Sequence, residues 1–125
     1  MGKDRYRRHI LVKEVGQKGQ KTLASKHAIL IGGGGLGSNS ANLLVRMGIG
    51  HIDIIDYDTI DKTNLHRTSV FSEQDIGKNK ALVLEKRLQS VNTDVQVKGI
   101  NKKVTSKNIE SLINNADVIL DGTDN

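Results

Sequence analysis

The sequence of 125 residues contains no cysteine, no proline and no tryptophan. Without cysteine, these residues can form neither a disulfide framework nor a thiolate zinc site, and they carry no catalytic thiol. The aromatic residues are only two tyrosines and one phenylalanine, which argues against a platform on which the bases of single-stranded nucleic acid would stack. With proline absent, glycine is the main punctuation between elements of secondary structure.

Long apolar runs are also lacking. Apolar residues make up 36% of the sequence and occur in short clusters such as 28–31 and 118–120, which predicts a packed globular domain rather than disorder. A membrane-spanning helix needs roughly 20 consecutive apolar residues, and the first eight residues show no apolar segment of a secretory signal. We therefore expect a soluble cytoplasmic protein with no membrane partner.

The net charge of +5 is confined to the N-terminal segment. Residues 1–26 hold eight Lys and Arg against two Asp and Glu, whereas the remainder holds eleven against twelve. Such a segment is a solvated leader, a phosphate-contacting arm or a patch for nucleic acid. The sequence leaves these three alternatives open.

Hydrophobic periodicity predicts an α/β fold after an N-terminal helical arm at about 13–25. Four β-rich runs are expected as strands, at 27–31, 52–56, 95–100 and 116–121. The helix between the first two strands has Leu36, Ser40, Leu43, Leu44 and Met47 at helical spacing and ends at Gly48. Later helices are expected at 78–90 and at 106–115, the last one capped by Thr105 or Ser106. This alternation predicts a Rossmann-like, doubly wound and mainly parallel sheet.

A glycine-rich motif follows the first predicted strand and opens the first helix. Its glycines include Gly32, Gly34, Gly35 and Gly37, and missing side chains at such a turn let backbone N–H groups approach a phosphate. Asp56 lies nineteen residues after Gly37 at the end of the second strand, where an acid accepts hydrogen bonds from ribose hydroxyls. Up to this point a dinucleotide dehydrogenase domain fits equally well.

Three later motifs separate those possibilities. They read Asp-Tyr-Asp-Thr-Ile-Asp-Lys-Thr-Asn-Leu-His-Arg at 56–67, Gly-Lys-Asn-Lys-Ala at 77–81, and Asp-Gly-Thr-Asp-Asn at 121–125. Together with Arg-Tyr-Arg-Arg at 5–8, they resemble the signatures of the ThiF/MoeB/HesA and ubiquitin-activating superfamily. The resemblance covers essentially the whole chain, with His9, Thr68 and Asn79 where that family often has Gln, Gln and Pro.

The resemblance implies a role for each matching residue. The glycine loop would contact the nucleotide, Asp56 the ribose, and Asn64, Arg67 and Lys80 the phosphates. Asp124 would hold Mg²⁺, and Arg8 would reach the ATP of a partner subunit. The catalytic set implied is Arg8, Arg67, Lys80 and Asp124. The ATP-binding set implied is Gly32, Gly34, Gly35, Gly37, Asp56, Asp58, Thr63, Asn64, Leu65, His66, Arg67, Lys80, Asp124 and Asn125.

The activity implied is adenylation, with ATP and Mg²⁺, of the C-terminal carboxylate of a ubiquitin-like or sulfur-carrier protein. Arg67 and Lys80 suit it because cations offset the charge of a triphosphate, and Asp124 because a carboxylate oxygen holds Mg²⁺. A homodimer is implied as well. Two alternatives stay open: a tRNA-modifying dehydratase of the same superfamily, and a nucleotide-binding or dimerisation fragment without activity alone. Because family members continue past Asn125, we expect residues 1–125 to be an incomplete adenylation domain, truncated at the C-terminus.

Overall fold

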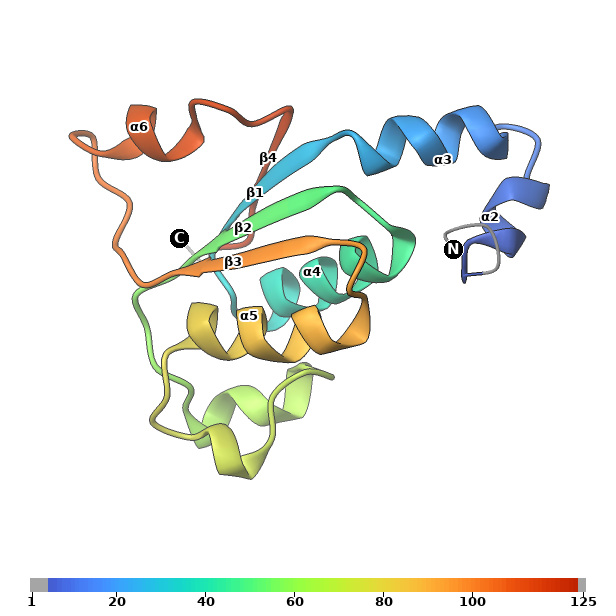
Figure 1. The fold of residues 1–125 in the computed structure, drawn as a ribbon. Coiled ribbons are helices and arrows are strands. Elements are labelled where there is room, and N and C mark those ends of the chain that lie inside the picture. Colours follow the sequence, from blue (N-terminus) through green and yellow to red (C-terminus); the bar gives the residue numbers. More distant parts are fainter. Residues whose placement is uncertain (1–4, 124–125) are drawn as a thin grey trace.

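The computed structural model describes residues 5–123, which form one parallel sheet with helices on both faces (Figure 1). The strands lie in the order β3-β2-β1-β4, and every neighbouring pair is parallel. Their bounds are His27–Ile31 for β1, His51–Ile55 for β2, Gln96–Ile100 for β3 and Val118–Asp121 for β4. The Rossmann-like, mainly parallel sheet predicted from the sequence is confirmed.

The core lies between the sheet and two helices, α4 (Gly35–Met47) and α5 (Lys80–Val91). Side chains from alternate strand positions, such as Leu30 and Ile54, meet Val45, Leu84 and Leu88 of these helices and are buried. The connection between β3 and β4 holds the short helix α6 (Ile109–Ile113), which lies on the opposite side of the sheet from α4 and α5 in Figure 1. The central strands β1 and β2 are thus buried, as strands of a parallel sheet usually are.

The apolar face predicted for α4 is confirmed only at Leu44, which packs against the core. Leu36 and Leu43 are 69% and 61% exposed, and the buried positions are Gly37, Ser38, Ala41 and Val45. Small residues face the sheet because the helix packs close to the glycine loop. The predicted end of this helix is right, since Gly48 caps it with a left-handed φ of 92°.

From residue 5 onward the N-terminal arm holds two short helices, α2 (Arg7–Leu11) and α3 (Gly16–Ala24). Helix α3 confirms the helix predicted at about 13–25, and α2 was not predicted. Tyr6 fixes the arm to the domain. Its ring lies so close to Gly48 that an added Cβ would come within 2.6 Å of it, and its hydroxyl accepts a hydrogen bond from Asn92 Nδ2 at 2.8 Å. Gly48 and Asn92 end α4 and α5, so the arm sits where β2 and β3 begin.

Other boundaries differ in detail from the sequence prediction. Helix α6 is assigned from Ile109, later than predicted, but the predicted cap at Thr105 is present: Thr105 N–H donates to Asn108 Oδ1 at 2.8 Å, Thr105 Oγ1 accepts from Asn108 N–H at 3.3 Å, and the turn so formed leads into the helix. The segment expected as a polar loop before α5 contains two 3-10 helices, η1 (Lys62–Arg67) and η2 (Glu73–Asp75). Within residues 5–123, no helix has the length and apolarity to cross a membrane.

Candidate nucleotide-binding site

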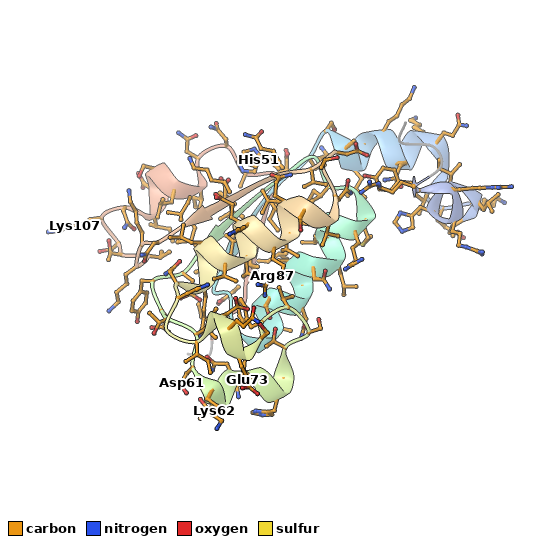
Figure 2. The ribbon with its side chains drawn as sticks, turned by 60° about the horizontal axis from the view of Figure 1, so that its bottom comes forward. His51, Asp61, Lys62, Glu73, Arg87 and Lys107 are labelled. Atoms are coloured by element: carbon orange, nitrogen blue, oxygen red, sulfur yellow. The ribbon has the colours of Figure 1, made fainter. Side chains whose placement is uncertain are left out.

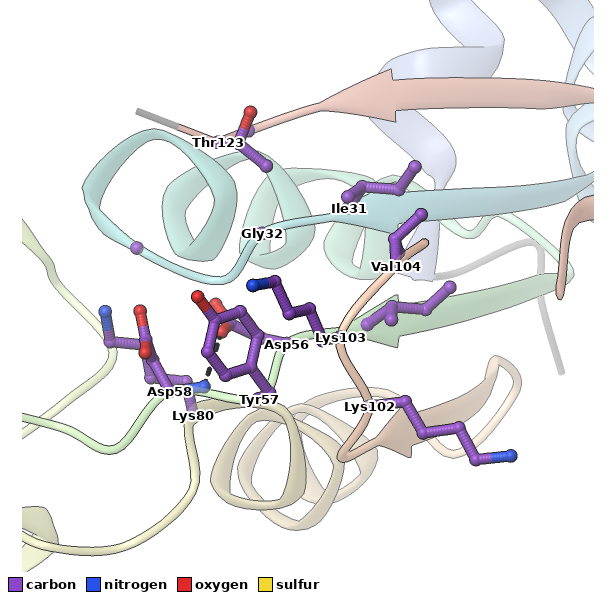
Figure 3. Close-up of a pocket in the computed structure, with 13 residues that line it drawn as sticks. Ile31, Gly32, Asp56, Tyr57, Asp58, Lys80, Lys102, Lys103, Val104 and Thr123 are labelled. Atoms are coloured by element: carbon purple, nitrogen blue, oxygen red, sulfur yellow. Dashed lines mark hydrogen bonds between the residues drawn. The ribbon is translucent and has the colours of Figure 1, made fainter. Parts of the chain in front are cut away.

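A cavity of about 270 Å³ opens at the carboxyl ends of the strands (Figure 3). Open parallel α/β sheets bind their ligands at this edge. The cavity joins the glycine loop after β1, the loop after β2, the first residue of α5, and the segments that follow β3 and β4. Its lining residues are Ile31, Gly32, Gly34, Ile55, Asp56, Tyr57, Asp58, Lys80, Lys102, Lys103, Val104, Gly122 and Thr123.

The glycine loop packs tightly on one side and is open on the other. A Cβ added at Gly37 would come within 1.9 Å of the Gly32 carbonyl oxygen, so the first turn of α4 can approach the loop only without a side chain. At Gly34, by contrast, an added Cβ would meet no protein atom within 4 Å. Gly34 lines the cavity and is the N-cap of α4, with no side chain capping the helix. The open side therefore presents free N–H groups of a helix N-terminus, which favour an anion.

Asp56 connects the end of β2 to the glycine loop. Its Oδ2 accepts a hydrogen bond from Gly33 N–H at 2.7 Å, and its Oδ1 accepts one from Asp58 N–H at 2.8 Å. Each carboxylate oxygen has a second lone pair, so Asp56 can hold the loop in shape and still accept from a ribose hydroxyl. The ribose-binding role predicted for Asp56 is therefore compatible with its hydrogen bonds to the loop backbone.

Lys80 is the first residue of α5 and is only 9% exposed. Its ammonium group makes no hydrogen bond or salt bridge with any other residue in the range 5–123, although its charge helps to lower the pKa of the Asp61 carboxyl. Burying a cation without an anion is costly, and this one lines the cavity. An anionic ligand there would supply the missing partner.

The η1 segment presents Arg67 beside the glycine loop. A Cβ added at Gly35 would come within 3.0 Å of the Arg67 Cδ and Cγ atoms, so the arginine stem lies directly over this glycine. Asp61 caps the segment: its carboxylate accepts from Thr63 N–H at 3.0 Å, and Asn64 Oδ1 accepts in return from Asp61 N–H at 2.9 Å. The hydrogen bond from the Thr63 N–H is also the main reason that the pKa of Asp61 is lowered.

The remaining residues implied by the resemblance lie outside the cavity lining or outside the described range. Thr63, Asn64, Leu65 and His66 belong to η1 and do not line the cavity. Arg8 is exposed on α2, at the end of the sheet where the strands begin (Figure 1). Asp124 and Asn125 lie outside the described residues. Asp121, at the end of β4, accepts hydrogen bonds from Thr123, which lower its pKa.

Sequence reasoning missed two features of this edge. Lys103 extends toward Asp56 and Gly32 in Figure 3, with its Nζ atom 5.5 Å from the centre of the Tyr57 ring, whereas the neighbouring Lys102 points away. The sequence signal that could have identified Lys103 is a pair of lysines just after the end of β3, at the edge of the sheet where ligands bind. Asn79 is the other feature: it caps α5 through Leu82 N–H at 3.0 Å and donates to the Asp56 carbonyl at 3.1 Å.

A glycine loop at a helix N-terminus, an acid ending the second strand and a nearly buried lysine in the same cavity together define a nucleotide-binding domain of the Rossmann-like class. Comparison with known proteins gives the family. The chain belongs to the ThiF family, whose model matches residues 6–125. It is similar to the sulfur carrier protein ThiS adenylyltransferase of Bacillus subtilis, with 43% identity over 97% of this chain and 37% of that protein. The sulfur carrier protein adenylyltransferase of Thermus thermophilus is 35% identical over 98% of this chain and 45% of the relative.

Solved structures give the same picture of the fold. The E. coli tRNA N6-threonylcarbamoyladenosine dehydratase TcdA, in complex with ATP, superposes with a TM-score of 0.91 and 28% identity over 98% of this chain and 50% of that one. E. coli MccB, with AMPCPP and MccA, superposes with a TM-score of 0.84 and 32% identity over 96% of this chain and 37% of MccB. The chain thus spans less than half the length of the two curated relatives named above.

Proposed function

We propose that the protein carrying this chain uses ATP to adenylate the C-terminal carboxylate of a sulfur-carrier or ubiquitin-like protein. The observation that carries the proposal is the cavity in which a nearly buried lysine without a direct salt bridge lies with a glycine loop and the Asp56 carboxylate. The similarity to proteins named as sulfur-carrier adenylyltransferases supports the choice of acceptor.

In the proposed reaction, a carboxylate oxygen of the carrier attacks the α-phosphorus of ATP. The bond from that phosphorus to the oxygen bridging to the β-phosphate breaks, pyrophosphate leaves, and an acyl-adenylate remains. The chain would contribute positioning and charge neutralisation. Asp56 would accept from the ribose hydroxyls, and the N-terminus of α4 with Lys80 and Arg67 would stabilise the negative charge on the phosphates.

Mg²⁺ fits the donor set of this edge, because it prefers carboxylate and phosphate oxygens. Asp58 lines the cavity and its carboxylate has no partner among residues 5–123, so it can contribute an oxygen. The family resemblance assigns the metal to Asp124, and we retain Asp124 as the proposed ligand. When bound, the ion would neutralise charge on the triphosphate. Asp124→Asn should then slow ATP–pyrophosphate exchange by roughly a hundredfold or more while leaving nucleotide binding without metal unchanged.

Nucleotide choice is the first test. Calorimetric titration of the complete protein should show tighter binding of MgATP than of NAD⁺, and carrier protein should induce exchange of labelled pyrophosphate into ATP. Tighter binding of NAD⁺ would overturn the proposal. Exchange that depends on tRNA instead of a carrier protein would favour the dehydratase alternative, for which the similarity to TcdA is the supporting observation.

We also propose that Arg8 acts on the ATP bound by a partner subunit. Its helix α2 lies at the opposite end of the sheet from the cavity (Figure 1), so a role within its own subunit is disfavoured by distance. Mixing Arg8→Ala subunits with Lys80→Ala subunits of the complete protein should restore part of the exchange activity, because one composite site is then intact. Subunit exchange without rescue would contradict the role in trans.

A further inference from the structure

Two histidines and one aspartate meet where β1 and β2 begin. His27 and His51 are paired in register, and Asp53 follows His51 by two residues, so the three side chains project from the same face of the sheet. The intervening residues Ala28 and Ile52 face the other way, into the core formed with α4 and α5. The cluster therefore lies on the face opposite those helices.

The Asp53 carboxylate lies between the two imidazole rings. Its Oδ2 is 2.9 Å from His27 Nε2, and its Oδ1 is 2.7 Å from His51 Nε2. The rings stack with their centroids 4.0 Å apart and their planes 14° from parallel. One nitrogen from each ring and one carboxylate oxygen lie within 4.8 Å of one another.

The surroundings of His27 call for a positive charge between the side chains. Its Nδ1 lies 3.1 Å from the carbonyl oxygen of Asn115, and because a carbonyl only accepts, Nδ1 must carry a proton. A neutral imidazole has one N–H group, so Nε2 then presents a lone pair to Asp53 Oδ2, an acceptor only 2.9 Å away. Either a second proton or a metal ion must lie near these atoms.

We propose that His27, His51 and Asp53 bind a divalent transition-metal ion such as Zn²⁺. Two imidazole nitrogens and one carboxylate oxygen are a ligand set of zinc sites that keep an open position for water, whereas Mg²⁺ and Ca²⁺ prefer oxygen ligands throughout. A ligating histidine usually donates its other N–H group to a carbonyl or carboxylate, as His27 does to Asn115. The side chains are 17%, 30% and 12% exposed for His27, His51 and Asp53, so water and the ion can reach them.

This site is separate from the one proposed for Mg²⁺ with ATP. It lies at the amino ends of the strands, and the cavity lies at their carboxyl ends. Figure 2 shows His51 on the opposite side of the molecule from Asp61 and Lys62, which begin the η1 segment. The backbone N–H of His27 also donates to Oδ2 of Asp117, which lies just before β4, at 2.8 Å. The ion would thus link β1 and β2 close to the segment that leads into β4.

Zn²⁺ and Co²⁺ are the probes for the test, applied to the complete protein in the presence of excess Mg²⁺. Crystals soaked in either ion should give an anomalous-scattering peak between the His27 and His51 Nε2 atoms and the Asp53 carboxylate. In calorimetric titrations, His51→Gln should lack this binding event or weaken it by roughly tenfold or more, in the range known for disturbed metal sites. His9→Gln, a change on helix α2 outside both the cluster and the cavity, is the matched control and should bind Zn²⁺ as the unaltered protein does.

Asp53→Asn provides a second variant that keeps the size of the side chain and its capacity to accept a hydrogen bond. It should also weaken Zn²⁺ binding by roughly tenfold or more, while near-ultraviolet circular dichroism stays that of the folded protein. The proposal is overturned if no anomalous peak lies at this position, or if unaltered protein and His51→Gln bind Co²⁺ with the same stoichiometry and affinity. In that case protons alone hold the three side chains together.

Discussion

Two of the cations on helix α5, Lys80 and Arg87, lie two turns apart and have opposite surroundings. Arg87 reaches the nearly buried Asp75 of η2, with its Nη2 atom 3.0 Å from Oδ1, and it also donates to the Val70 carbonyl at 2.7 Å. Lys80 is more deeply buried than Arg87 and has no such partner within residues 5–123. Since proteins normally pair buried charges, we infer that Arg87 stabilises the fold, and we propose that Lys80 binds a ligand.

Removing the lysine should give the largest effect on activity. Lys80→Ala in the complete protein should lower ATP–pyrophosphate exchange by roughly 100-fold to 1,000-fold, the range found for losing a charge-stabilising group. Its stability should be unchanged or slightly higher, because a buried cation without a partner is removed. Exchange kinetics and urea unfolding measure the two effects, with the exposed Lys86→Ala on the same helix as the control. Full exchange activity of Lys80→Ala would contradict the proposed role of Lys80 in binding the nucleotide.

The reverse pattern is expected at the other cation. Arg87→Ala leaves the Asp75 carboxylate, which is 2% exposed, without its cation. Because the Arg87 side chain is itself 40% exposed, the cost should be about 2 kcal/mol, below that of breaking a fully buried pair. The free energy of unfolding should fall by about that amount in urea titrations, whereas MgATP affinity at a temperature where the protein stays folded should change little. Combining Arg87→Ala with Asp75→Asn should recover part of the loss, and a purely additive double variant would argue against the pair.

Acid titration sharpens the same point. The hydrogen bond from Arg87 lowers the pKa of Asp75 from 3.8 to about 2. A lowered folded-state pKa means that the stabilisation is complete above pH 3.8 and is lost as the pH falls through about 2. The shift corresponds to about 2 kcal/mol. Urea unfolding measured across this pH range should show a smaller loss of stability in Asp75→Asn than in the unaltered protein. If the free energy of unfolding falls equally with pH in both proteins, the lowered pKa of Asp75 is contradicted.

The sequence predicted the elements that depend on local patterns. The short β-rich runs of β1 and β2 and the glycine loop were recognisable because strand burial and tight turns leave periodic or compositional signals. The buried face of α4 was missed because it depends on how closely Gly37 approaches Gly32. The spacing of the leucines in the sequence gives no information on that distance. His27, His51 and Asp53 become neighbours only through the parallel register of β1 and β2.

The candidate site was predictable to a similar extent. The motifs identified Asp56 and Lys80, which line the cavity, but they could not show that Lys80 is buried without an acidic partner. They also gave no hint of Lys103, because its approach depends on the path of the segment after β3. Roles of Arg67, Asn64 and Asp124 remain predictions from the resemblance.

The smallest expected effect concerns Lys102 and Lys103, which follow β3. It tests whether a lysine of the cavity other than Lys80 contacts the bound nucleotide. Lys103 extends toward Asp56 and Gly32, whereas Lys102 points away (Figure 3). The two residues have the same charge and adjacent positions, and both are exposed, so a general effect of positive charge on a triphosphate would be nearly equal for them. A direct contact of Lys103 with the nucleotide would instead make the effects of the two substitutions differ.

Lys103→Ala should therefore weaken MgATP binding by roughly fivefold to tenfold, about 1 kcal/mol, as expected for a solvent-exposed cation near phosphate. Lys102→Ala should change it by less than about twofold. Calorimetric titration at low and high salt separates the causes, since a long-range attraction is screened at high salt and would make the two variants alike. If both variants lose affinity equally at low salt and neither does at high salt, Lys80 is left as the cavity lysine proposed to contact the nucleotide. If only Lys103→Ala loses affinity and the loss persists at high salt, the ligand contact includes the segment after β3.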